Sequence, residues 1–138
     1  MENLVLGSSN KDELSLVERV IKSFSRDLMV YFSEIPDPQT TPLTNFDDIA
    51  GNAKEKASFA KKEKPECIAV AFSTGVEDRE DYNAVTYEFE PYTLFIGVAV
   101  VMTPDGKEIL CSTETISAEK EFAELCRESL SSALLYVM

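Results

Sequence analysis

The chain has 138 residues, of which 44% are hydrophobic, and a formal net charge of −12 at pH 7. This length predicts one domain, and the apolar share argues against a disordered chain. The negative charge disfavours binding along a nucleic-acid backbone or to an anionic membrane, but it permits one nucleotide in a local cleft with a divalent cation.

The sequence contains three cysteines and no histidine. Cys67, Cys111 and Cys126 are scattered and form no Cys-x-x-Cys pair, so a zinc site is not expected. The absence of histidine excludes catalysis by a Ser-His-Asp triad or a Cys-His pair. Any chemistry must use carboxylates, lysines, hydroxyls or a metal ion. No run is long enough to span a bilayer and no signal-peptide pattern is present, so we expect a cytoplasmic protein with free thiols.

The first twelve residues predict a strand, a tight polar turn and the start of a helix. Residues 3–6 contain a short apolar run, Gly7 permits a sharp turn, and Asp12 is a candidate helix cap. Free N–H groups gather at a helix N-terminus, so the Ser-Ser-Asn segment at residues 8–10 is placed to bind phosphate. An ordinary strand-to-helix connection has the same pattern, and both interpretations are open.

A helix, a strand, a loop and a second helix follow. Apolar residues recur at spacings of three and four from residue 12 to about residue 26, which predicts an amphipathic helix. Residues 28–32 predict a second strand, parallel to the first through a right-handed crossover. A loop with three prolines spans residues 34–45, and a second helix is expected from residue 47 to about residue 62.

Asp47 and Asp48 lie at the start of this second helix. Carboxylates at this position often cap a helix and complement its macrodipole. They are also the oxygen ligands that Mg²⁺ prefers. The pattern alone leaves both interpretations open.

Residues 68–72 predict a central buried strand that ends in a polar, glycine-containing turn at residues 73–77. In an open α/β sheet, the loops after the carboxyl ends of the strands form the binding crevice. This turn and the polar turn after the first strand are therefore expected to face the same cleft.

Three strands and a helix complete the predicted fold. They span residues 85–90, 93–102, 107–113 and 118–138, with a strong turn at residues 103–106. The order β-α-β-α-β-β-β-β-α predicts a single α/β domain over residues 1–138 with a mixed sheet.

Four features in this order resemble the inosine/xanthosine triphosphatase branch (the YjjX-like proteins) of the ITPase-like superfamily of house-cleaning nucleotidases. They are the opening strand and Ser-Asn turn at residues 4–13, the acidic pair and Ala-rich helix at 47–57, the central strand and Gly-Val-Glu turn at 70–77, and the hairpin at 95–112. The resemblance implies a three-layer ITPase-like (anticodon-like) α/β fold with a central mixed sheet, elongated, with a cleft between two lobes.

The resemblance also implies hydrolysis of the non-standard purine nucleoside triphosphates ITP and XTP, with Mg²⁺ or Mn²⁺, by a homodimer. It assigns phosphate binding to Ser8, Ser9, Asn10, Lys11 and Lys56, catalysis and metal binding to Asp47 and Asp48, and the nucleotide cleft to Ser73, Thr74, Gly75, Glu77 and Arg127. Phosphoryl transfer chiefly requires such positioning and charge stabilisation. The apolar run at residues 94–102 and the apolar end of the last helix add to the expectation of a homodimer.

Two positions depart from the family pattern. The family has a lysine in the first turn of its first helix, where this chain has Glu13, and a carboxylate at the end of its central strand, where this chain has Ser73. Lys11 can replace that lysine only with a different geometry. The segment before the last helix is also compressed, and Arg127 is interpreted as a remnant of the base-recognition region.

The sequence therefore leaves functions of different classes open. One is a nucleoside triphosphate hydrolase with a rearranged site. Another is a catalytically weakened member that binds a nucleotide or a protein partner, because losing one electrostatic contributor typically costs about a hundredfold in rate. The third is an unrelated small α/β domain with an acidic interaction surface.

Overall fold

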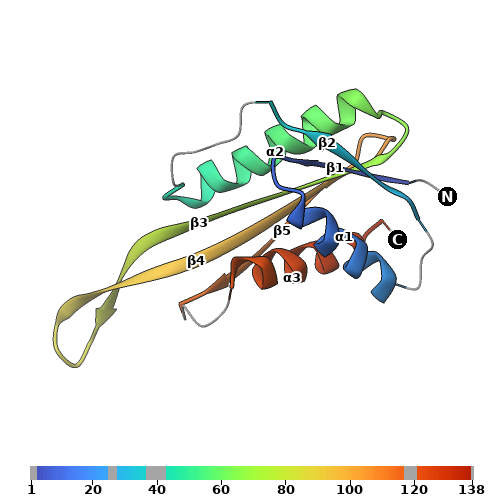
Figure 1. The fold of residues 1–138 in the computed structure, drawn as a ribbon. Coiled ribbons are helices and arrows are strands. Elements are labelled where there is room, and N and C mark those ends of the chain that lie inside the picture. Colours follow the sequence, from blue (N-terminus) through green and yellow to red (C-terminus); the bar gives the residue numbers. More distant parts are fainter. Residues whose placement is uncertain (1–2, 25–27, 37–42, 117–120, 138) are drawn as a thin grey trace.

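In the computed structural model, residues 3–24, 28–36, 43–116 and 121–137 are described, and they form a mixed five-stranded sheet with helices on both faces (Figure 1). The strands are β1 (Leu4–Ser8), β2 (Val30–Glu34), β3 (Ile68–Asn83), β4 (Glu88–Met102) and β5 (Glu108–Thr115), and the helices are α1 (Asp12–Ser23), α2 (Phe46–Glu63) and α3 (Phe122–Leu134). No helix in these ranges is long and apolar enough to cross a bilayer.

β1 lies inside the sheet, between its two parallel partners. The strand order is β2-β1-β3-β4-β5, and Leu4 pairs with Val30 on one side and with Ile68 on the other. The prediction that the first three strands are neighbours is therefore confirmed. The chain leaves β1 toward β2 and then crosses back to β3, so the carboxyl edge between β1 and β3 is a topological switch point, where open α/β sheets bind ligands.

The sheet separates two hydrophobic cores, because successive strand residues point to opposite faces. α2 covers one face with its small residues, and α1 and α3 cover the other (Figure 1). At Gly7 and at Gly97, a helix packs tightly against the sheet. A Cβ atom on Gly7 would collide with the carbonyl oxygen of Lys56, and one on Gly97 would lie 2.6 Å from the Cβ atom of Leu125.

The turn predicted at residues 73–77 is wrong, because β3 continues without a break to Asn83 and pairs with β4. Gly75 is not a turn residue. A Cβ atom there would lie 2.7 Å from the side chain of Ile49, so the glycine lets α2 pack closely on the strand. The two strands predicted at residues 85–90 and 93–102 are one strand, β4, and the preceding turn lies at residues 84–87.

The remaining elements match the predictions except at their ends. α1 ends at Ser23, β2 begins at Val30, and α3 begins at Phe122. Parts of three predicted elements lie outside the described residues: the end of the first helix, the middle of the proline loop, and the two ends of the last helix. These are residues 25–26, 37–42, 118–120 and 138.

The apolar run at residues 94–102 is almost entirely buried inside the chain, so it does not supply the surface that we expected for a homodimer. Large exposed apolar side chains lie near the turn between β3 and β4, where the two strands project beyond the helices (Figure 1), and at the predicted apolar end of the last helix, where Leu135 and Tyr136 are exposed. Tyr82 and Phe89 contact each other near the turn, with their ring centroids 5.4 Å apart. The homodimer stays a prediction.

Candidate functional site

The predicted phosphate site lies where β1 and β3 separate. The two strands pair only from Leu4 with Ile68 to Leu6 with Val70. Beyond this point β1 turns into α1, whereas β3 continues along β4. Lys56 of α2 reaches this gap, and its Nζ atom donates a hydrogen bond to the carbonyl oxygen of Phe72 at 3.0 Å. A positive charge is therefore placed at the switch point of the sheet.

Ser8 and Asn10 organise the turn that leads into α1. The buried Ser8 hydroxyl accepts a hydrogen bond from the Asn10 N–H at 3.0 Å and donates one to Oε1 of Glu13 at 2.6 Å. Oδ1 of Asn10 accepts from the N–H of Asp12 at 2.9 Å. The prediction that Asp12 caps the helix is wrong, because Asp12 is the first residue of α1 and Asn10 binds its N–H.

Several N–H groups of this turn already have acceptors within the chain. Those of Asn10 and Asp12 are bound to side chains, and the N–H of Glu13 donates to the Asn10 carbonyl at 3.2 Å. A phosphate would therefore have to displace these contacts, or use the exposed residues Ser9 and Lys11. Phosphate binding by residues 8–11 stays a prediction.

Glu13 faces a pocket of about 340 Å³ between α1, β3 and α3. Among the residues that line the pocket are Asn10, Asp12, Glu13, Thr74, Phe122 and Cys126. Burial raises the pKa of Glu13 above its ordinary value, and the Ser8 hydrogen bond and the charge of Lys56 oppose this rise. Burial, with a smaller contribution from Glu13, raises the pKa of the Cys126 thiol to about 12.

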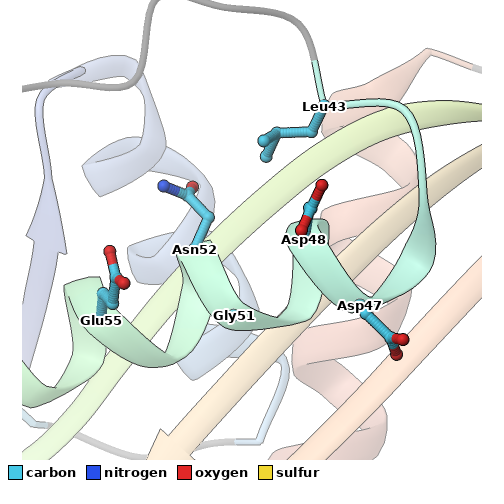
Figure 2. Close-up of a pocket in the computed structure, with 6 residues that line it drawn as sticks. All are labelled: Leu43, Asp47, Asp48, Gly51, Asn52 and Glu55. Carbon is cyan, nitrogen blue, oxygen red and sulfur yellow. The ribbon is translucent and has the colours of Figure 1, made fainter.

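The acidic pair lies in a second pocket, of about 290 Å³, beside the start of α2 (Figure 2). Oδ2 of Asp48 accepts from Nδ2 of Asn45 at 2.8 Å, and Oδ1 of Asn45 accepts from the N–H of Asp48 at 2.9 Å. Asn45 is thus the N-cap, and Asp48 completes a reciprocal capping pair. The start of α2 is therefore capped by Asn45, and Asp48 holds the side chain of this cap in place.

The side chains of Asp47 and Asp48 point in different directions, and their predicted role in metal binding stays a prediction. Figure 2 shows the Asp48 side chain beside Leu43, whereas the Asp47 side chain points away from it. Within the described part of the chain, no cluster of three acidic or cysteine side chains is arranged to hold a metal. Asp48, Asn52 and Glu55 line the pocket from successive turns of α2, and Asp48 and Glu55 contribute carboxylates to its lining.

The residues predicted to line one nucleotide cleft lie on two faces of the sheet. Ser73 is buried beneath α2, where its hydroxyl donates to Oδ1 of Asn52 at 2.9 Å. Thr74, the next residue of β3, faces the pocket that contains Glu13. This separation follows from the uninterrupted strand, because neighbouring side chains of a strand alternate between faces.

Glu77 and Arg127 are engaged elsewhere. Glu77 accepts a hydrogen bond from Nε of Arg79 at 2.5 Å and one from the N–H of Phe46 at 3.3 Å. The hydrogen bond from Arg79, with that from Phe46, holds the pKa of Glu77 below its ordinary value. Arg127 pairs with Glu124 at 3.7 Å across one turn of α3.

Sequence reasoning missed Asn52 as the partner of Ser73. The available signal was the spacing of Asn52 and Lys56, which are four residues apart and so share one face of α2. Both side chains turn toward β3, where they bind Ser73 and the carbonyl of Phe72.

The arrangement resembles two solved structures. Protein VC0702 from Vibrio cholerae superposes with a TM-score of 0.69 at 12% identity, over 99% of this chain and 95% of that chain. A nucleoside-triphosphatase/dITP/XTP pyrophosphatase from Mycobacterium abscessus superposes with a TM-score of 0.55 at 17% identity, over 81% of this chain and 70% of that chain. The chain has the ITPase-like fold.

No protein-family model and no curated protein sequence matches the chain significantly. At this level of identity, the likeness establishes the ITPase-like fold. It does not by itself establish a substrate, since one fold hosts many functions. The function of the chain depends on the chemistry of the residues around Lys56.

Proposed function

We propose that the chain hydrolyses nucleoside triphosphates of the non-standard purine class, ITP and XTP, in the manner of a house-cleaning nucleotidase. The observation that carries the proposal is the ammonium group of Lys56 at the switch point between β1 and β3. Phosphoryl transfer depends mainly on positioning and on charge stabilisation, and a lysine beside a strand-turn-helix supplies both.

In this proposal, Lys56 exchanges the Phe72 carbonyl for a phosphate oxygen, and the exposed Ser9 and Lys11 side chains contribute further donors. The divalent cation, Mg²⁺ or Mn²⁺, arrives with the triphosphate as part of the substrate. The ITPase-like fold of a dITP/XTP pyrophosphatase supports the substrate class. Membership of the inosine/xanthosine triphosphatase branch, the homodimer and the cytoplasmic location belong to the same proposal.

A catalytically weakened protein that binds nucleotide or a protein partner is the second candidate. Two observations favour it. Glu13 places a carboxyl group where relatives are expected to have a lysine, and the Ser73 hydroxyl is already bound to Asn52. The Ser73 hydroxyl is therefore not free to replace the carboxylate that the family resemblance implies at the end of this strand.

A turnover assay separates the two candidates. ITP, XTP, ATP and GTP are offered with Mg²⁺ or Mn²⁺, and released phosphate and pyrophosphate are measured. For the hydrolase, we expect turnover of ITP and XTP and a loss of about a hundredfold or more in Lys56→Met. Lys54→Met is the matched control, because Lys54 lies on the same helix but pairs with Glu108 at the surface.

The outcomes are distinct. A nucleotide-dependent thermal shift without turnover, abolished by Lys56→Met, identifies the binding module. Faster turnover in the double variant Glu13→Lys with Ser73→Glu also supports a weakened site. If neither turnover nor a thermal shift is found with any nucleotide, the hydrolase and the nucleotide-binding module are both wrong, and a protein-binding module is the candidate left. Light scattering at micromolar concentration tests the homodimer separately.

A further inference from the structure

Glu13 is placed to contact whatever binds at the turn between β1 and α1. Its carboxyl group accepts the Ser8 hydroxyl at 2.6 Å and lines a pocket together with Asn10 and Thr74. The charge of Lys56 is close enough to influence it. A phosphate bound by Lys56 at the gap between β1 and β3 would therefore lie beside this carboxyl group.

An ionised carboxylate in that position opposes an anion. Like charges at close range in a partly desolvated site disfavour each other strongly, and the site responds by taking up a proton. A protonated carboxyl group, in contrast, donates a hydrogen bond. The same residue is thus either an obstacle to phosphate or a ligand for it, depending on one proton.

We propose that Glu13 binds phosphate as a neutral carboxylic acid, donating a hydrogen bond to a phosphate oxygen, so that anion binding is accompanied by the uptake of one proton from solvent. This inference rests on the proposed phosphate site. It assigns Glu13 the role of a phosphate-binding residue, in place of the lysine that the family resemblance leads one to expect.

The groups around Glu13 favour this protonation once the anion is bound. Lys56 of α2 is the cation that supports the ionised carboxylate, and a phosphate engages that cation. Asp12 of α1 faces the same pocket and adds negative charge, and Lys11 is exposed on the turn. Cys126 of α3 is a neutral thiol, since its pKa is about 12. Ser8 of β1 and Thr74 of β3 carry no charge.

Burial already raises the pKa of Glu13 in the free protein, which lowers the cost of protonation. The bound anion raises this pKa further. At pH values between the Glu13 pKa of the free protein and that of the complex, each rise of one pH unit lowers phosphate affinity by about tenfold through this group. Above the bound value the affinity no longer depends on Glu13 titration.

The test uses inorganic triphosphate and isothermal titration calorimetry with the full chain. Binding is measured in two buffers with different ionisation enthalpies, for wild type, Glu13→Gln and the control Glu18→Gln, which lies exposed on the same helix. We expect wild type and Glu18→Gln to take up about one more proton per triphosphate than Glu13→Gln. The titration of the triphosphate itself cancels in this difference.

The pH dependence gives an independent readout. At about pH 8, Glu13→Gln should bind triphosphate about tenfold or more tightly than wild type, because a neutral amide replaces a group that must be protonated. The two affinities should converge as the pH falls below the Glu13 pKa. If Glu13→Gln does not fold, proton uptake is measured for the binding of sulfate to wild type alone. The charge of sulfate is constant over this pH range, so any proton taken up belongs to the protein.

Three results would overturn the inference. If wild type and Glu13→Gln bind triphosphate with equal affinity and equal proton uptake, the role of Glu13 is wrong and the proposed phosphate site is retained. If none of the three proteins binds triphosphate at any pH, with or without Mg²⁺, the proposed phosphate site is wrong, and the inference fails with it. Absence of proton uptake with sulfate, despite binding, also contradicts the inference.

Discussion

Gly7 of β1 lies directly beneath the carbonyl group of Lys56, where any Cβ atom would collide with the helix backbone. α2 therefore packs tightly on β1 at the residue that carries the candidate phosphate-binding ammonium group. The same contact that packs the core also fixes where Lys56 leaves the helix.

We predict that Gly7→Ala destabilises the protein by about 3 kcal/mol, because α2 must move away from β1 to accept the methyl group. Denaturant unfolding measures the change. Gly51→Ala is the control, since nothing lies within 4 Å of a Cβ atom there. Gly51 is inside a helix, so this change should stabilise by about 0.5–1 kcal/mol. A neutral Gly7→Ala would contradict the close packing.

Glu13 should make stability depend on pH with a defined sign. Its pKa in the folded protein is raised above the ordinary value of 4.5, so the unfolded chain ionises first as the pH rises. Stability from this group is complete below about pH 4.5 and is lost as the pH rises through the folded-state pKa.

Glu13→Gln should therefore raise the melting temperature at neutral pH and leave it nearly unchanged in acid. Thermal melts across this range, with Glu18→Gln as the exposed control, measure the difference. A Glu13→Gln variant that is less stable at neutral pH than wild type would show that the ionised Glu13 carboxylate is favoured by the fold.

The thiol of Cys126 should be unreactive in the folded protein. It is buried, and its pKa is about 12, so almost no thiolate is present at about pH 8. Cys67 is buried as well, whereas Cys111 is half-buried. A thiol-exchange reagent should therefore react with Cys111 first, and with all three cysteines only after unfolding. Rapid modification of Cys126 in the native state would contradict the packing of α3.

Tyr87 should be a site where substitution stabilises the protein. Its backbone has a φ of 60°, a left-handed conformation that is costly for an aromatic residue, and its side chain is 80% exposed. Tyr87→Asn or Tyr87→Gly should raise stability by about 1 kcal/mol, because both residues tolerate this conformation. A drop in the unfolding midpoint would indicate that the exposed ring contributes contacts.

Segments in which apolar residues recur with a regular spacing, because one face is buried, could be predicted from the sequence. The apolar run of β1 and the helical stripe of α1 are required by the two cores, and both elements lie where the pattern placed them. Asp47 and Asp48 were ambiguous for a physical reason, because carboxylates suit both a helix start and a cation. In the structure Asn45 caps the helix and hydrogen-bonds Asp48, and the metal-binding role of the acidic pair stays a prediction.

Residues 73–77 could not be predicted from local composition. Ser73 and Gly75 favour a turn in isolation, but long-range pairing with β4 and the close approach of α2 make this segment a strand. The sequence also could not predict that the Lys56 ammonium group lies at the gap in the sheet, because this depends on where β1 and β3 separate. Tertiary contacts between distant segments overrode local preference in both cases.

The order in which strands pair has a consequence for synthesis on the ribosome. β1 leaves the ribosome first, yet one of its two partners is Ile68–Val70 of β3, which is made only after both of the first two helices. β3 and β4, in contrast, are joined by a short turn and can pair as soon as both are available. Contacts that are local in sequence form faster than distant ones. We therefore expect the β3–β4 hairpin to gain protection from hydrogen exchange before β1 during refolding, and earlier protection of β1 would reverse this order. A nascent chain that ends before β3 has no complete sheet, so its N-terminal apolar strand is the segment that a chaperone would have to cover.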